Sequence, residues 1–210
     1  GGVGYRLGTM EKDTVQYQND RDCFGACAGA GLYSKDFFAR TGLFDQNFFA
    51  YLEDVDLNFR ANRMGLRCRF IASAVVYHIG SATSGSKIND FTVRLSTRNN
   101  LYVLAKNYTV GMYFCFLPSI LVYQLMWLAF CCKHKVVKPY FIGLWQGARL
   151  FFRFAAKGRA FVNDNSVSSV KDFTERICFS EKMAVKSLIA RREAASKGNF
   201  LLHSYLRLFL

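Results

Sequence analysis

The chain has 210 residues, of which 51% are hydrophobic, and only 2 prolines. This composition excludes a disordered or proline-rich chain, and the length allows one or two packed cores. The formal net charge of +13 is uneven, because residues 1–100 carry 12 basic and 10 acidic side chains while residues 101–210 carry 16 and 5. Basic charge beside apolar sequence favours an anionic membrane surface over nucleic acid as a partner.

The start of the chain and its cysteines indicate what kind of protein the sequence belongs to. The chain begins at Gly1 without a methionine, and we expect it to be the C-terminal part of a longer protein. Its 7 cysteines show neither zinc-ligand spacing nor a disulfide framework. They are interpreted as reduced thiols packed as small apolar side chains, which is typical of a cytosolic region.

The first predicted elements are a strand and a short helix. Residues 24–32 are small and apolar, which is typical of a buried strand that a ligand or another backbone approaches closely. Ser34 can then N-cap a helix over residues 35–40, which Gly42 closes.

A helix, a strand and a second helix are predicted next. Residues 54–64 carry apolar side chains at helical spacing. Residues 67–77 alternate as a β-strand does, with His78 at the end of the strand and a Gly/Ser loop behind it. Residues 92–106 have the pattern of a helix.

Residues 107–132 contain no charged side chain, and the run is long enough to span a bilayer. Lysines lie on both sides of it, at Lys106 and Lys133, and a single span would put one half of the chain outside against the positive-inside tendency. Pro118 also interrupts the run. We therefore expect an in-plane or re-entrant element with both flanks in the cytosol, and a spanning segment is the alternative.

Glu53, Asp54 and Asp56 stand at the start of a predicted helix, directly after the aromatic-rich residues 48–51. Helix N-termini stabilise anions, so acidic residues there are common for structural reasons alone. The aromatic side chains favour a further role, because they can wall a pocket in which a carboxylate acts as general base on a hydroxyl. His78 follows a predicted strand, where open α/β sheets bind ligands, and imidazole is a common metal ligand.

Residues 25–83 resemble the C-terminal half of the catalytic domain of family 2 glycosyltransferases, and most of all the rhamnosyltransferase-like members that build bacterial surface polysaccharides. The resemblance covers about residues 23–106. The positions that match the family pattern are Gly25, Ala26, Gly42, Phe44, Asp45, Phe48, Phe49, Tyr51, Glu53, Asp54, Asp56, Leu57, Arg60, Gly65, Val76, His78 and Gly80.

The resemblance implies an α/β fold class. Residues 1–106 would be the C-terminal, acceptor-side half of a GT-A (Rossmann-like) nucleotide-sugar transferase domain, and residues 107–210 a helical, basic, membrane-associated region. The implied activity is inverting transfer of a sugar from a nucleotide-diphosphate donor to a lipid-linked or growing polysaccharide acceptor. The implied location is the cytoplasmic face of the cell membrane, with peripheral attachment or one hydrophobic segment over residues 107–132.

The resemblance also implies roles for single residues. Asp54 would be the general base that deprotonates the acceptor hydroxyl. A divalent cation, magnesium or manganese, would neutralise charge on the leaving diphosphate. Glu53 and Tyr51 would bind the acceptor. His78 would be a metal ligand, and Arg94 and Arg98 would bind the diphosphate.

The chain departs from the family pattern in two places. The arginine that usually follows the small apolar segment is absent, and Lys35 stands nearby instead. An Asp-x-Asp metal motif is also missing from a suitable strand context, since residues 20–22 lie too close to the acidic motif. We therefore expect the donor-binding half to lie outside this chain and the chain alone to be inactive. Two alternatives are a non-enzymatic membrane-anchoring or scaffold segment and, less favoured, a nucleic-acid-binding protein.

Overall fold

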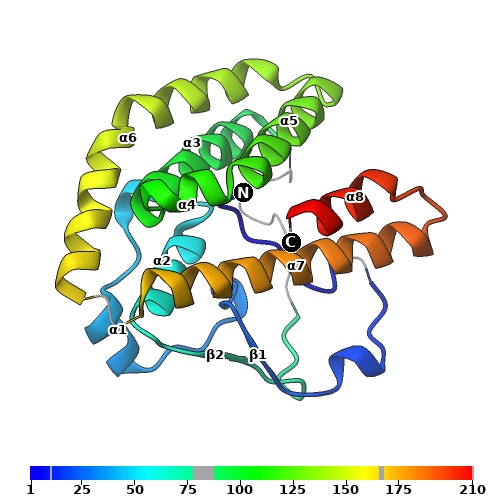
Figure 1. The fold of residues 1–210 in the computed structure, drawn as a ribbon, viewed down its shortest axis with the longest axis horizontal. Coiled ribbons are helices and arrows are strands. Elements are labelled where there is room, and N and C mark those ends of the chain that lie inside the picture. Colours follow the sequence, from blue (N-terminus) through cyan, green and yellow to red (C-terminus); the bar gives the residue numbers. More distant parts are fainter. Residues whose placement is uncertain (10, 78–87, 166–167, 210) are drawn as a thin grey trace.

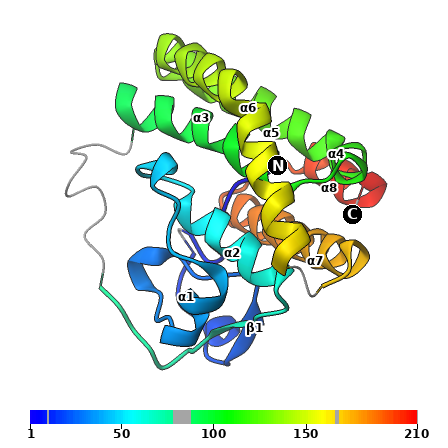
Figure 2. The same ribbon diagram turned by 90° about the vertical axis from the view of Figure 1, so that its left-hand side faces the viewer.

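The computed structural model describes residues 1–9, 11–77, 88–165 and 168–209, and it is 67% helical. Two views of the ribbon show α3 and α6 as one helical layer, with α7 and α8 beside it and the small sheet at the opposite end (Figures 1 and 2). The elements are η1 (Val15–Tyr17), β1 (Arg21–Cys23), η2 (Ala28–Ala30), α1 (Lys35–Thr41), η3 (Gln46–Phe48), α2 (Glu53–Arg63), β2 (Cys68–Phe70), α3 (Asp90–Asn107), α4 (Val110–Cys115), α5 (Leu117–Lys133), α6 (Val137–Asn165), α7 (Val170–Ala194) and α8 (Phe200–Phe209).

The predicted α/β fold class is wrong. The described residues contain one sheet of two short strands, β1 and β2, which pair antiparallel with Cys23 opposite Cys68. A Rossmann-like domain needs a mostly parallel sheet with helices on both faces. The chain is instead a mainly helical protein and not the α/β GT-A domain that the resemblance implies.

Residues 24–32 do not form the predicted strand, because side chains of α2 satisfy the backbone groups that a neighbouring strand would otherwise pair with. Gly25 permits this approach, since a Cβ at this position would collide with Asn58. The three hydrogen bonds run from Asn62 Nδ2 to the carbonyl of Phe24 (2.7 Å), from Asn58 Nδ2 to the carbonyl of Ala26 (2.8 Å) and from the N–H of Ala28 to Asp54 Oδ2 (3.2 Å).

The strand predicted over residues 67–77 is shortened to Cys68–Phe70. Its alternating apolar residues predict one buried face, and a face is buried only where another layer covers it. The side chains of Val75, Val76 and Tyr77 are instead 70%, 58% and 96% exposed. His78, the expected end of this strand, lies outside the described residues.

The helices predicted in the first half are confirmed. Ser34 Oγ accepts a hydrogen bond from the N–H of Phe37 at the start of α1, and Gly42 ends that helix with φ +71°. Gly65 follows α2 with the same φ, a conformation that glycine adopts at little cost. The observed α3 begins two residues before the predicted range, at Asp90.

The main core joins both halves of the chain. Its buried side chains come from η3, α2 and α3 in the first half and from α4, α6 and α7 in the second, with Phe48, Phe59, Phe154 and Phe173 among them. Glycines let α6 approach α3 closely, because a Cβ at Gly143 or Gly158 would meet the α3 backbone. The predicted division at residue 106 stays a prediction.

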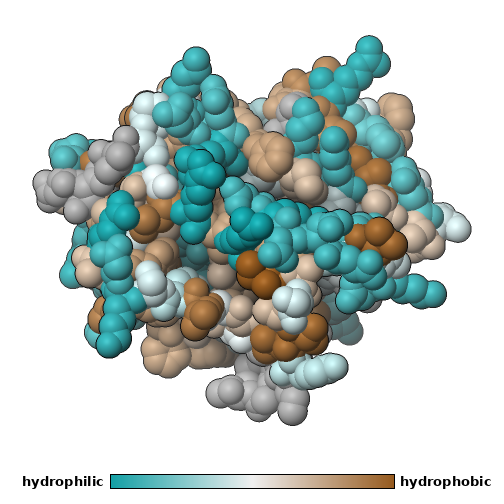
Figure 3. Space-filling view, turned by 90° about the horizontal axis from the view of Figure 1, so that it is seen from below, coloured by the Kyte–Doolittle hydropathy of each residue, from teal (hydrophilic) through white to brown (hydrophobic). Residues whose placement is uncertain are grey.

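The uncharged run forms two helices. α4 ends at Cys115 and α5 begins at Leu117, with Pro118 in the first turn of α5, where a proline is tolerated. Within the described ranges, none of the helices combines the length and the apolar character needed to cross a membrane. The face that carries β1 and β2 mixes hydrophilic and hydrophobic residues over its whole extent (Figure 3).

Candidate functional site

The loop that leads into α2 is held in an unusual backbone conformation. Phe49, Tyr51 and Leu52 have φ values of 64°, 68° and 65°, although none of them is glycine. Non-glycine residues in such conformations cost about 1–3 kcal/mol each and persist where surrounding contacts enforce them. Because α2 starts at Glu53, this loop fixes the position of the first carboxylates of the helix.

Asn99 and Arg98 of α3 hold the loop through its backbone carbonyls. Asn99 is fully buried, and its Nδ2 donates to the carbonyls of Phe48, Ala50 and Tyr51 at 2.9, 2.8 and 2.7 Å. Arg98 Nη2 donates to the carbonyl of Phe48 at 2.7 Å, and Arg98 Nε donates to Asn99 Oδ1 at 2.9 Å. The guanidinium that we predicted to bind diphosphate therefore takes part in supporting the loop.

Asp54 is half-buried and accepts two backbone hydrogen bonds. Its Oδ2 receives the N–H of Ala28 at 3.2 Å and its Oδ1 the N–H of Val55 at 2.8 Å. An ionised carboxylate has about four acceptor positions, so both oxygens keep a lone pair for a ligand. Asp54 is thus held by protein donors in a fixed orientation while it retains capacity to accept a proton.

The neighbouring Glu53 has such a donor, its own backbone N–H, on only part of its carboxylate. Its Oε2 is buried and accepts no hydrogen bond from any described residue. Burial raises the pKa of Glu53 above its ordinary value, and the negative charge of Asp54 raises it further. A buried acceptor without a donor is costly, so this carboxylate is suited to a hydroxyl or another donor from a ligand.

Tyr33 carries a hydroxyl within electrostatic range of Asp54 and Glu53. The side chain stacks among aromatic residues of α1 and the loop behind it, with ring centroids 5.1 Å from Phe37 and 5.2 Å from Phe38. Its hydroxyl is buried and has no hydrogen-bond partner within the described part of the chain. Burial raises the pKa of Tyr33 to about 12, and the negative charges of Asp54 and Glu53 contribute to the same rise.

Tyr51 lies on the strained loop itself. Its carbonyl accepts from Asn99, and its ring packs edge-on against Phe91 of α3 with centroids 6.3 Å apart. Phe91 also contacts Phe49, at 6.2 Å. The predicted acceptor-binding ring is therefore supported by α3 and stands at the edge of the site.

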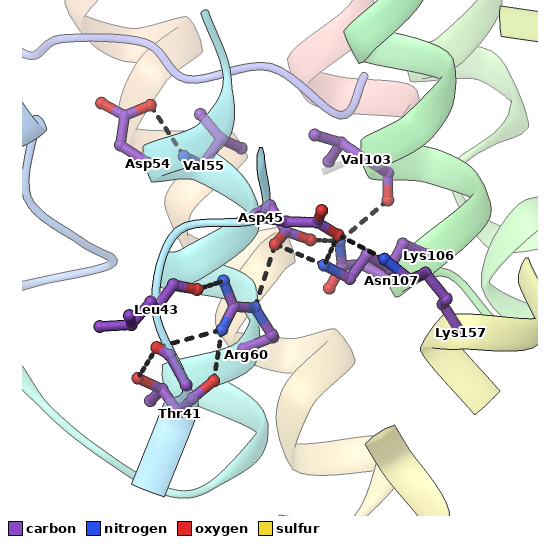
Figure 4. Close-up of polar contacts among 12 residues, drawn as sticks. Thr41, Leu43, Asp45, Asp54, Val55, Arg60, Val103, Lys106, Asn107 and Lys157 are labelled. Carbon is purple, nitrogen blue, oxygen red and sulfur yellow. Dashed lines mark hydrogen bonds and ion pairs between the residues drawn. The ribbon is translucent and has the colours of Figure 1, made fainter. Parts of the chain in front are cut away.

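Asp56 belongs to a separate, buried cluster, whose members Arg60, Lys106 and Asn107 are labelled in Figure 4. This carboxylate is completely buried and accepts from Arg60 Nε at 3.0 Å, Lys106 Nζ at 2.8 Å and Asn107 Nδ2 at 3.1 Å. Lys106 also pairs with Asp45 at 2.9 Å. Figure 4 shows Asp54 at the start of α2, apart from this cluster, so adjacent acidic residues of one motif have different surroundings.

The remaining predicted residues lie elsewhere or cannot be placed. Arg94 lines a surface cavity at the start of α3. His78 is outside the described residues, and among those described there is no group of three His, Cys, Asp or Glu side chains that could hold a metal ion. Metal binding at His78 stays a prediction, and no chemical step below is derived through a metal.

Reasoning from the sequence missed three contributors to the site. Tyr33 falls at the place where the chain departs from the family pattern, which is the one signal that could have drawn attention to it. Asn99 follows Arg98 directly, yet an asparagine within a helix has no signature for a distant loop. The N–H of Ala28 is a backbone group, and its contact with Asp54 depends on the tertiary fold alone.

Comparison of the chain with protein-family models, with curated proteins and with solved structures gave no match. The resemblance to glycosyltransferases therefore rests on the sequence motif, and the function below rests on that motif together with the site geometry.

Proposed function

We propose that the chain supplies the acceptor side of an inverting sugar-transfer reaction, with Asp54 as the general base. The observation that carries the proposal is the oriented Asp54 carboxylate next in sequence to a buried oxygen, Glu53 Oε2, that has no hydrogen-bond partner among the described residues. The buried Tyr33 hydroxyl, also without a partner among the described residues, lies within electrostatic range of both carboxylates. The hydroxyl is a hydrogen-bond donor and Glu53 Oε2 an acceptor, which matches the mixed donor and acceptor character of a sugar hydroxyl. The proposal concerns the chemistry and does not depend on a GT-A fold.

In the proposed step, an acceptor hydroxyl loses its proton to the Asp54 carboxylate as its oxygen attacks the anomeric carbon of the donor sugar. The new bond forms on the face opposite the nucleotide diphosphate, and the bond from the anomeric carbon to the diphosphate oxygen breaks. The N–H groups of Ala28 and Val55 fix the orientation of Asp54, so no reorientation is needed at the moment of transfer. Positioned proton transfer contributes about 10²–10⁴-fold to rate.

Glu53 and Tyr51 are the proposed acceptor contacts. Glu53 Oε2 would accept a hydrogen bond from a second acceptor hydroxyl, which removes the cost of an unpaired buried oxygen. Tyr51 would offer its ring to the sugar at the rim, where Phe91 supports it. The strained loop supports this assignment, because strain of this kind is concentrated at ligand-binding positions.

The acceptor is proposed to be presented at a membrane surface by α4 and α5. These helices carry one stripe of exposed apolar side chains at helical spacing: Val110, Phe114, Leu117, Leu121 and Leu125, exposed by 74%, 75%, 45%, 53% and 67%. Exposed Lys133 and Lys135 follow the stripe at the end of α5. An apolar stripe with adjacent lysines suits an in-plane position on anionic lipid.

The transfer reaction is tested in membranes of cells that carry the gene at its native locus. The membranes are offered a panel of radiolabelled nucleoside-diphosphate sugars, and label in the lipid extract and in polymeric glycan is measured. Asp54→Asn is expected to lower transfer by at least 100-fold at equal chain abundance. Near-normal transfer by Asp54→Asn removes the base assignment.

The matched control is Asp36→Asn. Asp36 is also an acidic residue in the first turn of a helix, but it is exposed on α1 and outside the site. Its replacement is expected to leave transfer unchanged, which separates catalysis from a helix-end charge effect. Glu53→Gln is expected to raise the acceptor KM and leave the donor KM unchanged.

The scaffold alternative is kept because the exposed stripe alone would explain a membrane anchor. Flotation with vesicles of phosphatidylcholine and phosphatidylglycerol tests the shared membrane part, and the double variant Leu121→Glu, Leu125→Glu is expected to lose flotation while the control Val15→Glu keeps it. Flotation of the double variant at the wild-type level contradicts the surface assigned to α4 and α5. If flotation requires the exposed apolar stripe and Asp54→Asn transfers sugar normally, a membrane-anchoring segment describes the chain better than the acceptor side of a transferase.

A further inference from the structure

A second polar site lies where the first turns of α3 and α6 meet. A surface cavity of about 460 Å³ opens there, and it contains two cationic side chains, one carboxylate and an apolar wall. The residues that line it are Asp90, Phe91, Arg94, Lys138, Pro139 and Ile142. The cavity is thus formed by both predicted regions of the chain, one on each side of residue 106.

The charge of this cavity favours an anion. Arg94 and Lys138 outnumber Asp90, so the lining has an excess of positive charge. Within the described ranges, neither the Arg94 guanidinium nor the Lys138 ammonium forms an ion pair or a hydrogen bond with another side chain. A planar guanidinium beside an ammonium is a combination well suited to phosphate oxygens.

The apolar part of the cavity continues on the protein surface. Phe91 is 40% exposed and Ile142 37%, and the next exposed apolar residues of α6 are Phe141 (54%) and Trp145 (62%). A free phosphate makes no use of such a surface, whereas a lipid chain attached to a phosphate is matched by it. A nucleobase stacks on aromatic side chains as well, and the uridine diphosphate probe below tests that occupant.

The cavity is also connected with the candidate site. The Phe91 ring that lines it packs against both Tyr51 and Phe49 of the strained loop, at 6.3 and 6.2 Å. A ligand in the cavity therefore contacts the same aromatic support as the loop that precedes Glu53 and Asp54.

We infer that this cavity binds the phosphate group of a lipid-linked acceptor. Arg94 and Lys138 contact the phosphate oxygens, while Phe91, Ile142 and the neighbouring α6 side chains contact the first part of the lipid chain. The inference rests on the proposed function, since it names the acceptor as a lipid phosphate or diphosphate. It gives Arg94 a role on the acceptor, in place of contact with the leaving diphosphate of the donor.

Equilibrium binding to the full chain tests the inference without any transfer reaction. The probes are farnesyl diphosphate, inorganic pyrophosphate, farnesol and uridine diphosphate, each below its aggregation concentration. Farnesyl diphosphate is expected to bind at least tenfold more tightly than each of the other three. Equal binding of pyrophosphate, or tighter binding of uridine diphosphate, overturns the lipid assignment.

Variants then locate the site. Arg94→Gln and Lys138→Ala are each expected to weaken farnesyl diphosphate binding by about tenfold, because each removes a charge-assisted contact. Arg159→Gln on α6 and Lys171→Ala on α7 remove an exposed cation of the same kind outside the cavity and are expected to bind as wild type. Wild-type binding by both cavity variants overturns the inference.

Asp90→Asn provides a test in the opposite direction. It removes the one carboxylate among the described residues that line the cavity and is expected to tighten binding by about threefold, an outcome that damage to the fold does not produce. Weaker binding by Asp90→Asn contradicts an anion site. Asp54→Asn is expected to bind farnesyl diphosphate as the wild type does. The binding assay therefore tests the cavity separately from the assignment of Asp54 as the base.

Discussion

The substitution Asn99→Asp tests whether α3 enforces the conformation of the loop before α2. The change keeps the size of the side chain and replaces its NH₂ group, the hydrogen-bond donor, with a second oxygen. In the wild type, Asn99 Nδ2 donates to the carbonyls of Phe48, Ala50 and Tyr51. In the variant, a negatively charged group faces the same three carbonyl oxygens.

The expected loss of stability follows from the partners that remain. The carbonyl of Phe48 keeps the hydrogen bond from Arg98, whereas the carbonyls of Ala50 and Tyr51 lose the donor that Asn99 provides. An unsatisfied buried acceptor costs about 1–3 kcal/mol, and both hydrogen bonds are only partly buried. We expect the free energy of unfolding to fall by about 2–4 kcal/mol, with the loop released from its positive φ values.

Chemical denaturation measures the free energy, and amide hydrogen exchange over residues 50–56 measures the loop. Asn100→Asp is the control, because Asn100 is equally buried and donates to the carbonyls of Gly1 and Gly2 instead. It is expected to lower stability without a selective increase of exchange in the loop. A loss below about 1 kcal/mol for Asn99→Asp, or loop exchange no faster than in Asn100→Asp, refutes the reasoning.

Three further predictions concern buried charge, pH and oxidation. Asp56→Asn leaves Arg60 without its carboxylate and Lys106 with Asp45 alone, and it is expected to lower the free energy of unfolding by about 2–4 kcal/mol in urea denaturation. The folded state raises the pKa of Glu53, so the wild-type protein loses stability as the pH rises above the pKa of Glu53 in the unfolded chain. Glu53→Gln is therefore expected to be more stable than the wild type at pH 7, with no difference in stability below pH of about 4. A difference that stays constant with pH would contradict this. Cys23 and Cys68 are opposite each other in β1 and β2 with sulfurs 3.4 Å apart, so diamide is expected to link them, as peptide mapping by mass spectrometry will detect.

The local signals in the sequence predicted helices and caps well. Ser34, Gly42 and Gly65 act through their own backbone and nearest turns, so their effect is visible without knowledge of the fold. The strands failed because strand pairing is not local. Residues 24–32 have the composition of a strand, but Asn58 and Asn62 of α2 bond to their backbone, and no pattern in the sequence indicates that contact.

The site shows the same division between local and tertiary information. The acidic motif was found at the start of α2, where it was expected. The contacts that orient Asp54 and bury Asp56 could not be predicted, because each involves a partner far along the chain. Lys106 is 50 residues from Asp56, and Ala28 is 26 residues from Asp54.

The ratio of sugar-transfer rates between Asp54→Asn and Asp36→Asn, in membranes with equal amounts of each chain, tests the central claim most directly. The proposed base predicts a ratio of about 0.01 or less, since only Asp54 takes the proton from the acceptor. A ratio near one, with transfer clearly dependent on the presence of the chain, would contradict the assignment of Asp54 as the base.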